Sequence, residues 1–389
     1  MKKSKRLDKI PPYLFVKIEE KKEELQKQGK DIIDFGIGDP DLPTPAHIFK
    51  KMHDVLEQPE SGQYPTSKGE FAFRKAVSKW YKKRFKVELN PRDEICCLLG
   101  SKEGLAHLPL CFIDKGDVSL VPDPSYPVYK ICTTLAGGEA YLMPLTAEND
   151  FLPDLDGIPK DVLKKARLLY INYPNNPTGA VADKSFLEKC VKFAKDNDLL
   201  LVSDLAYSEM GYDGFKPSSV LEIPGAKDVT IEFHSLSKTY NMTGWRIGMA
   251  VGNKEAIGAL ATIKSNLDSG TFKAIQFAAI EALSGPQDCV AENNKVFEER
   301  RNVLYNGLAS LGWKFEKPKA TFYMWVPVPK EETSASFTEK LLEKAGILVV
   351  PGNGYGPSGE GYVRFAITIP KERIAEAIER MKQQGIAYS

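Results

Sequence analysis

A repeated alternation of short apolar runs and amphipathic helical segments constrains the fold of this chain more than any other feature. Six runs rich in β-branched residues are predicted strands: EICCLL, VSLVPDP, ARLLYINYP, LLLVSDLAY, VTIEFHS and RIGMAVGN. Several are continuously apolar, which is typical of strands in a sheet covered on both faces. Residues 69–86, 184–198 and 254–267 place apolar side chains at helical spacing between them. The alternation predicts an α/β fold with a mostly parallel sheet.

The pattern changes from about residue 290 onward. A long charged helical segment is followed by the strand candidates FYMWVPV, ILVVPG and YVRFAI, and the helix KERIAEAIERMKQQ closes the chain. This order predicts a smaller α+β domain beside the large one. The expected division is an N-terminal arm over 1–40 that joins the small domain, a large domain over 41–285 and the small domain over 286–389.

Charge and composition narrow the class of partner. The chain has 53 Lys and Arg against 52 Asp and Glu, which gives a net charge of +1. A net charge this small does not attract nucleic acid or an anionic membrane. No apolar stretch is long enough for a signal peptide or a membrane span, and a cytoplasmic protein that binds small metabolites is expected. The six cysteines form no C-x-x-C pair and the four histidines have no metal-ligand spacing, so we predict no metal.

Polar residues follow several predicted strands, where open α/β sheets bind their ligands. Gly100-Ser101-Lys102 follows EICCLL and begins a helix, so its free N–H groups and its hydroxyl are suited to an anion; an ordinary capped helix is the alternative. Asn176 lies in an Asn-Pro-Thr-Gly turn after ARLLYINYP and is either a turn residue or a donor to a phenolate-like oxygen. Asp204 after LLLVS is either a helix cap or the partner of a pyridine nitrogen.

The fourth strand, VTIEFHS, leads into a lysine between hydroxyl groups. Lys238 follows Ser235 and Ser237, and Arg246 comes shortly afterwards. A lysine amine can form a Schiff base with an aldehyde, and the hydroxyls and the guanidinium are suited to a phosphate on the same molecule. The alternative is a solvated lysine in a polar loop.

Taken together and in this order, with Tyr126, Tyr207 and a late Arg364 in YVRFAI, these motifs resemble the class I aminotransferases of fold type I, which use pyridoxal 5′-phosphate (PLP). The resemblance covers essentially the whole chain. It implies the PLP-dependent transferase fold of type I, with a mostly parallel seven-stranded sheet in the large domain.

The resemblance also implies roles around the PLP ring. Lys238 would bind the PLP aldehyde covalently and move the proton between the substrate Cα and the cofactor. Asp204 would pair with the ring nitrogen. Asn176 and Tyr207 would hydrogen-bond the ring oxygen, and Tyr126 would stack on the ring face.

The remaining residues would bind the phosphate of the cofactor and the substrate. The implied phosphate ligands are Ser101, Lys102, Ser235, Ser237 and Arg246, with Tyr64 reaching in from the partner subunit of a homodimer. Arg364 would clamp the α-carboxylate of the amino acid or 2-oxo acid substrate through a bidentate pair, and the backbone of Gly38 would lie against that carboxylate.

Within the family, segments such as LPTPAHI, GSKEGLAH, NYPNNPTGAVA and EFHSLSKTYNMTGWRIG look like LL-diaminopimelate aminotransferases. This implies transamination between LL-2,6-diaminopimelate and 2-oxoglutarate, giving tetrahydrodipicolinate and glutamate, in lysine biosynthesis and in either direction. Such a substrate has a second amino and carboxylate group, for which Tyr13, Lys102 and Asn266 are candidates, although each fits a structural role as well. Asn176 is also expected near the substrate.

Two alternatives stay open at this point. One keeps the fold and the cofactor but has a broader specificity, with transamination of alanine, aspartate or aromatic amino acids, or catalyses β-elimination. The other is a regulator built on an aminotransferase-like domain, which the chain disfavours because it has no basic excess and no spare length before the expected catalytic domain for a DNA-binding segment.

Overall fold

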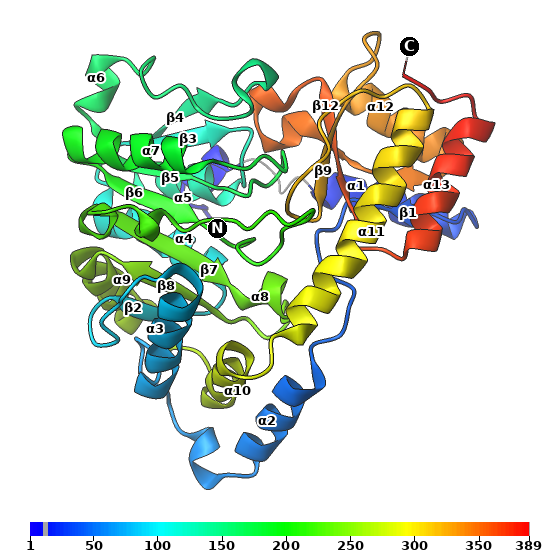
Figure 1. The fold of residues 1–389 in the computed structure, drawn as a ribbon. Helices are drawn as coiled ribbons and strands as arrows, with labels where there is room; N and C mark the ends of the chain where they lie inside the picture. Colours follow the sequence, from blue (N-terminus) through cyan, green and yellow to red (C-terminus); the bar gives the residue numbers. More distant parts are fainter. Residues whose placement is uncertain (11–14, 389) are drawn as a thin grey trace.

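A seven-stranded sheet forms the centre of the molecule in the computed structural model, which describes residues 1–10 and 15–388. Its strands lie in the order β2-β8-β7-β6-β5-β3-β4 (Figure 1). Only β8 runs antiparallel to its neighbours, β2 and β7. The mostly parallel α/β fold predicted from the sequence is confirmed. The strands are β2 (Ile95–Leu98), β3 (Val118–Asp123), β4 (Glu139–Pro144), β5 (Ala166–Ile171), β6 (Leu200–Asp204), β7 (Thr230–Ser235) and β8 (Gly248–Gly252).

Helices cover both faces of this sheet, and alternate strand residues face opposite layers. Cys96 and Leu98 of β2 belong to the core with α4, α5 and α9, whereas Ile95 and Cys97 belong to the core with α2, α3 and α10. This period of two explains why the sheet strands are continuously apolar. The helices are α2 (Ala46–Leu56), α3 (Phe71–Phe85), α4 (Ser101–Phe112), α5 (Val128–Ala136), α6 (Lys160–Leu163), α7 (Lys184–Asp196), α8 (Leu236–Thr239), α9 (Lys254–Leu267) and α10 (Lys273–Ser284).

A second, antiparallel sheet of order β11-β12-β9 forms in the C-terminal part of the chain. The predicted run ILVVPG divides into β10 and β11, which join different sheets, because β10 pairs with β1 near the N-terminus. The elements are α1 (Phe15–Lys27), β1 (Ile33–Asp34), α11 (Asp288–Ser310), β9 (Tyr323–Pro327), α12 (Ser334–Lys340), β10 (Ile347–Leu348), β11 (Val350–Pro351), β12 (Tyr362–Ala366) and α13 (Lys371–Gln383).

Hydrogen bonds from β12 and the residues just after it hold the backbone carbonyls of the segment that follows β1. Phe35 O accepts from the Ala366 N–H at 2.8 Å, and Ile37 O accepts from the Thr368 hydroxyl at 2.7 Å. Phe35 packs edge-on against Phe365, with ring centroids 5.1 Å apart. This anchoring directs the segment from Gly36 onward across to the carboxyl ends of the large sheet. In the described part of the chain, no helix combines the length and the apolar character that crossing a bilayer requires.

Candidate active site

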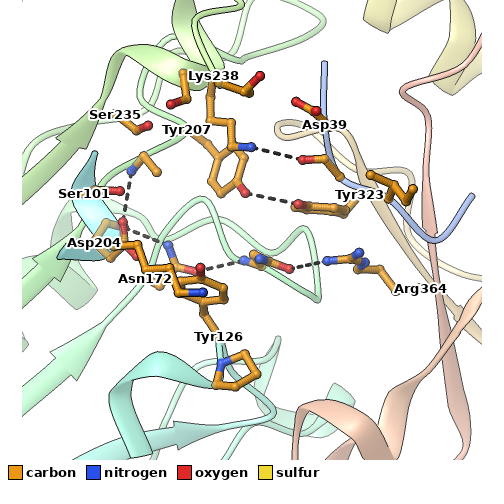
Figure 2. Close-up of a pocket in the computed structure, with 18 of the residues that line it drawn as sticks. Asp39, Ser101, Tyr126, Asn172, Asp204, Tyr207, Ser235, Lys238, Tyr323 and Arg364 are labelled. Carbon is orange, nitrogen blue, oxygen red and sulfur yellow. Dashed lines mark hydrogen bonds between the residues drawn. The ribbon is translucent and has the colours of Figure 1, made fainter. Parts of the chain in front are cut away.

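A cavity of about 570 Å³ lies at the carboxyl ends of the parallel strands. Figure 2 shows that side chains from several strand ends converge on it. Twelve of the residues predicted from the sequence line it: Gly38, Ser101, Lys102, Tyr126, Asn176, Asp204, Tyr207, Ser235, Ser237, Lys238, Arg246 and Arg364. The fold therefore brings most of the predicted residues together.

Lys238 lies in the short helix α8 that follows β7, and its side chain reaches across the cavity. Its Nζ donates to Gly38 O at 3.0 Å (Figure 2) and lies 5.4 Å from the centre of the Phe322 ring. Burial lowers the pKa of this amine below its usual range. A larger share of Lys238 is therefore neutral near pH 7, which is the form able to act as nucleophile or base.

Asp204 is buried at the end of β6. Its carboxylate accepts from the Tyr129 hydroxyl at 2.7 Å and from the Ala206 N–H at 3.3 Å. Burial raises the pKa of Asp204 to about 6, and the Tyr129 hydrogen bond partly opposes that rise. The charged form of a buried carboxylate with only these neutral donors is stabilised most by a cationic partner, such as a protonated ring nitrogen.

The start of α4 and Arg246 form the anion-binding end of the cavity. Gly100 has a φ of +80°, and a Cβ at this position would lie 2.3 Å from Arg246 Nη2. Arg246 itself has a φ of +55°, and its Nη1 donates to Thr243 O at 2.7 Å. Backbone N–H groups at the helix start, the Ser101 hydroxyl and this guanidinium supply donors that suit a phosphate.

Arg364 of β12 is a buried cation held by neutral oxygens. Its Nη1 donates to Asn176 Oδ1 at 2.9 Å and its Nη2 to Gly36 O at 2.8 Å. The guanidinium lies over the ring of Tyr323, 4.1 Å from its centre, and its Nε has no hydrogen-bond partner among the described residues. A buried guanidinium without a bound carboxylate is a ready partner for the carboxylate of a substrate.

Two predicted residues, Tyr64 and Asn266, do not line the cavity. Tyr64 is 85% exposed on the surface. Asn266 lies exposed near the end of α9, where its side chain donates to Thr262 O at 2.9 Å. Tyr13 lies outside the described residues.

The structure adds residues that the sequence did not single out. Tyr323 lines the cavity, and a hydrogen bond of 3.3 Å joins its hydroxyl to that of Tyr207 (Figure 2). Asn172 donates to Asp204 O at 2.7 Å and accepts from the Asn176 N–H at 2.8 Å. The alternation in FYMWVPV places Tyr323 on one face of a strand, but no local pattern says which cavity that face meets.

The fold and the cavity define a PLP-dependent transferase of fold type I. The family model for aminotransferases of class I and II matches residues 30–381, and the chain belongs to this family. It is 57% identical to the LL-diaminopimelate aminotransferase of Moorella thermoacetica, with 98% of each chain covered. It is 55% identical over the full length of both chains to LL-diaminopimelate aminotransferase 2 of Trichormus variabilis. The substrate-bound structure of BacF from Bacillus subtilis matches with a TM-score of 0.96 and 37% identity, covering 100% of this chain and 99% of BacF.

The protein is therefore an aminotransferase that uses PLP. The donors in the cavity fit that cofactor. A phosphate suits the end formed by Gly100, Ser101 and Arg246, and a pyridine nitrogen suits the buried Asp204, whose own hydrogen bonds come from neutral donors. Lys238 supplies the amine in the same cavity.

Proposed function

We propose that this enzyme transfers an amino group between LL-2,6-diaminopimelate and 2-oxoglutarate, producing tetrahydrodipicolinate and glutamate, in the biosynthesis of lysine. The observation that carries the proposal is the 57% identity, over nearly the whole chain, to an enzyme of that name. The Arg364 guanidinium supports it, because both substrates carry an α-carboxylate.

Bound PLP supplies an aldehyde that accepts the amino group and a ring that takes up electrons from the substrate Cα. Lys238 would bind the cofactor and carry the proton to and from Cα, a task that its lowered pKa favours. The Asp204 carboxylate would hold the proton on the ring nitrogen. Tyr207 and Asn176 would orient the ring through its oxygen, and Tyr126 would lie against the ring face.

The two ends of the cavity would hold the anionic groups. The phosphate ligands that we propose are Ser101, Lys102, Ser235, Ser237 and Arg246, all of which line the cavity. Arg364 would bind the substrate α-carboxylate through two parallel hydrogen bonds, next to the Gly38 backbone. The Gly38 carbonyl now accepts from Lys238, so this hydrogen bond would exchange when the cofactor and the substrate occupy the cavity.

The distal amino and carboxylate groups of diaminopimelate need further polar partners. Lys102 lines the cavity and its Nζ lies 5.8 Å from the centre of the Tyr126 ring, so it is our first candidate for the distal carboxylate. Asn266 and Tyr13 stay predictions.

We also propose a homodimer in which Tyr64 completes the phosphate site of the partner subunit. Three large apolar side chains, Tyr64, Leu267 and Phe272, are 85%, 59% and 39% exposed. Lys273 Nζ donates to Gln63 Oε1 at 3.3 Å, so the segments that carry these side chains are neighbours. An exposed apolar group of this kind suits a subunit interface.

The domain division at residues 40 and 285 and the cytoplasmic location are retained as proposals. The pairing of β1 with β10 supports assigning the N-terminal arm to the small domain.

The substrate proposal is tested by single-substrate kinetics of the purified enzyme. Amino transfer to 2-oxoglutarate is measured from LL-diaminopimelate, alanine, aspartate and phenylalanine, and we expect kcat/KM to be highest by far for LL-diaminopimelate. A higher value for any of the other three would replace the proposal with a class I aminotransferase of broader specificity.

A further inference from the structure

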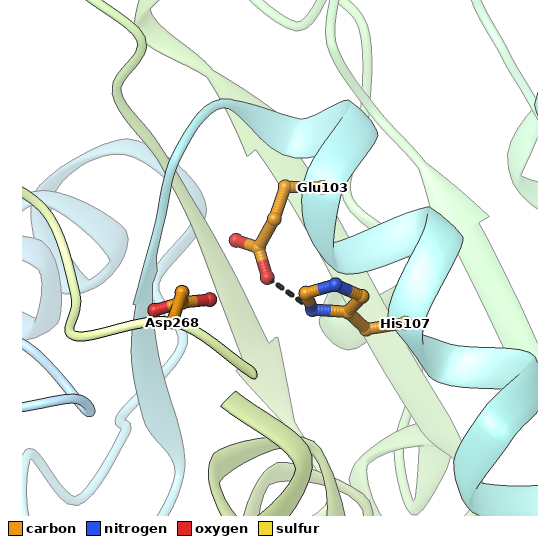
Figure 3. A group of neighbouring side chains, drawn as sticks. All are labelled: Glu103, His107 and Asp268. Atoms are coloured by element: carbon orange, nitrogen blue, oxygen red, sulfur yellow. Dashed lines mark ion pairs between the residues drawn. The ribbon is translucent and has the colours of Figure 1, made fainter. Parts of the chain in front are cut away.

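A cluster of ionisable side chains lies just behind the start of α4, outside the cavity. Glu103 and His107 on α4 approach Asp268 beyond the end of α9 (Figure 3), and one ligand atom from each lies within 4.8 Å of the others. That spacing suits a metal ion, but Lys264 already provides a cation. Its Nζ lies 2.9 Å from Glu103 Oε2 and 3.1 Å from Asp268 Oδ2. The cluster is therefore a buried ion network centred on an ammonium group.

The side chain of Lys264 is completely buried, with 0% exposed. Burial alone would lower the pKa of Lys264, but Glu103 and Asp268 raise it overall. Burial likewise works to raise the pKa of Glu103, yet His107 and Lys264 hold it below the usual range. Both groups thus stay charged, and a charged pair in this setting holds one geometry, because any displacement leaves a buried charge unpaired.

Glu103 connects this network to the anion-binding end of the cavity. The oxygen that binds Lys264, Oε2, also accepts from the Leu99 N–H at 3.0 Å. Leu99 immediately precedes the Gly100-Ser101 turn, and its carbonyl accepts from Arg246 Nη2 at 3.4 Å. The backbone donor and acceptor of Leu99 are therefore both held, one by the ion network and one by the guanidinium.

We infer that Lys264 is a positioning residue for the cofactor phosphate. Lys264 holds the Glu103 carboxylate in place, and this carboxylate holds the turn before α4 through the Leu99 N–H. This turn positions the start of α4 and, through the Leu99 carbonyl, the Arg246 guanidinium. Asp268 holds Lys264 from the other side and accepts from the Gly270 N–H at 2.7 Å. The inference rests on the proposed phosphate roles of Ser101 and Arg246. Lys264 itself does not line the cavity.

The test compares PLP with pyridoxal, which lacks the phosphate, as ligands of the full-length apoenzyme. We expect Lys264→Met to weaken PLP binding about tenfold, the effect of losing one hydrogen bond to a charged group, and to leave pyridoxal binding unchanged. Lys264→Arg keeps the charge and should restore much of the PLP affinity. Lys254→Met, at the exposed start of the same helix, is the matched control and should bind both ligands as the wild type does.

Two outcomes would overturn the inference: an equal loss of PLP and pyridoxal affinity, or no loss at all. Arg246→Ala separates this failure from that of the proposed site. If Arg246→Ala lowers the ratio of PLP to pyridoxal affinity and Lys264→Met does not, only the role of Lys264 is wrong. If neither variant changes the ratio, the phosphate assignment is wrong as well. If Lys264→Met does not fold, the double variant Lys264→Met/Asp268→Asn replaces it, because it leaves one fewer carboxylate unpaired. The ratio of PLP to pyridoxal affinity is then measured for the double variant.

Discussion

At the scale of single residues, burial sets the ionisation of the groups that face the cavity. It lowers the pKa of Lys238 and raises that of Asp204 to about 6, so both shifts favour the neutral forms. The cause is the same for both, because a charged group loses hydration when it is buried. A cationic ring nitrogen beside Asp204 would offset that loss, which makes this carboxylate a selective partner for a protonated heterocycle.

Replacing Lys238 with alanine removes the cavity amine that donates to Gly38 O. We expect Lys238→Ala to abolish amino transfer and to form no covalent adduct with PLP after borohydride reduction. Mass spectrometry of the reduced protein measures the adduct. A variant that still carries it on another residue would contradict the assignment.

The Tyr129 hydroxyl stabilises the charged form of Asp204. In Tyr129→Phe this hydrogen bond is lost, so the pKa of Asp204 rises further and the acid limb of PLP binding moves to higher pH. A pH series of PLP affinities with the apoenzyme measures the shift. Tyr170→Phe is the control, since Tyr170 is also buried and stacks on Tyr129 with centroids 4.9 Å apart, and its hydroxyl has no hydrogen-bond partner in the described part of the chain. An equal shift in both variants would count against a specific role for Tyr129.

Arg364→Lys keeps a positive charge but loses the planar pair of donors. We expect KM for the amino donor and for 2-oxoglutarate to rise about 10- to 100-fold, as for the loss of a charged hydrogen bond. Arg301→Lys is the control: Arg301 is buried and binds Asp213 through two nitrogens, at 2.7 and 3.2 Å, away from the cavity. Its KM values should be unchanged, and an unchanged KM in Arg364→Lys would refute the clamp.

At the scale of helices and strands, the motifs at strand ends were predictable because local sequence defines both the strand and the polar residue that follows it. Asp204 and Lys238 are examples. Tyr323 was not predictable, because its position depends on how the small sheet meets the large one. The edge strand β4 was also missed, since only Met143 in it is buried and its pattern gives no clear period. The division of ILVVPG into β10 and β11 depends on β1, which is distant in sequence.

The turn before α4 gives a prediction at this scale. Gly100→Ala adds a Cβ at a φ of +80° and 2.3 Å from Arg246 Nη2, so the guanidinium must move. We expect an unfolding free energy lower by about 1 kcal/mol, from backbone strain, together with weaker PLP binding. Gly116→Ala is the control, since Gly116 has a φ of +99° and no atom of the described residues lies within 4 Å of the added Cβ. Gly116→Ala should lower the free energy of unfolding and leave the PLP affinity unchanged. If Gly116→Ala also weakened PLP binding, the weaker binding in Gly100→Ala would be explained by backbone strain alone.

At the scale of the whole molecule, the proposed homodimer has two composite sites. Mixed dimers of Tyr64→Ala and Lys238→Ala subunits contain one site with both wild-type groups. Co-expression of the two should therefore restore about a quarter of the wild-type activity, more than either variant has alone. Sedimentation measures the oligomeric state, and activity that never exceeds that of Tyr64→Ala would show that Tyr64 acts only within its own subunit.

The hydrogen bonding of residues 33–37 to the C-terminal part of the chain affects the order in which the protein folds during its synthesis. The Gly36 carbonyl meets Arg364, and Ile33 pairs with Ile347, so residues 33–37 are synthesised early but gain these partners only when about the last forty residues have emerged. On the ribosome the large sheet can fold before the substrate end of the cavity exists. A nascent chain halted before β12 should therefore acquire its central sheet without gaining the ability to bind a substrate carboxylate.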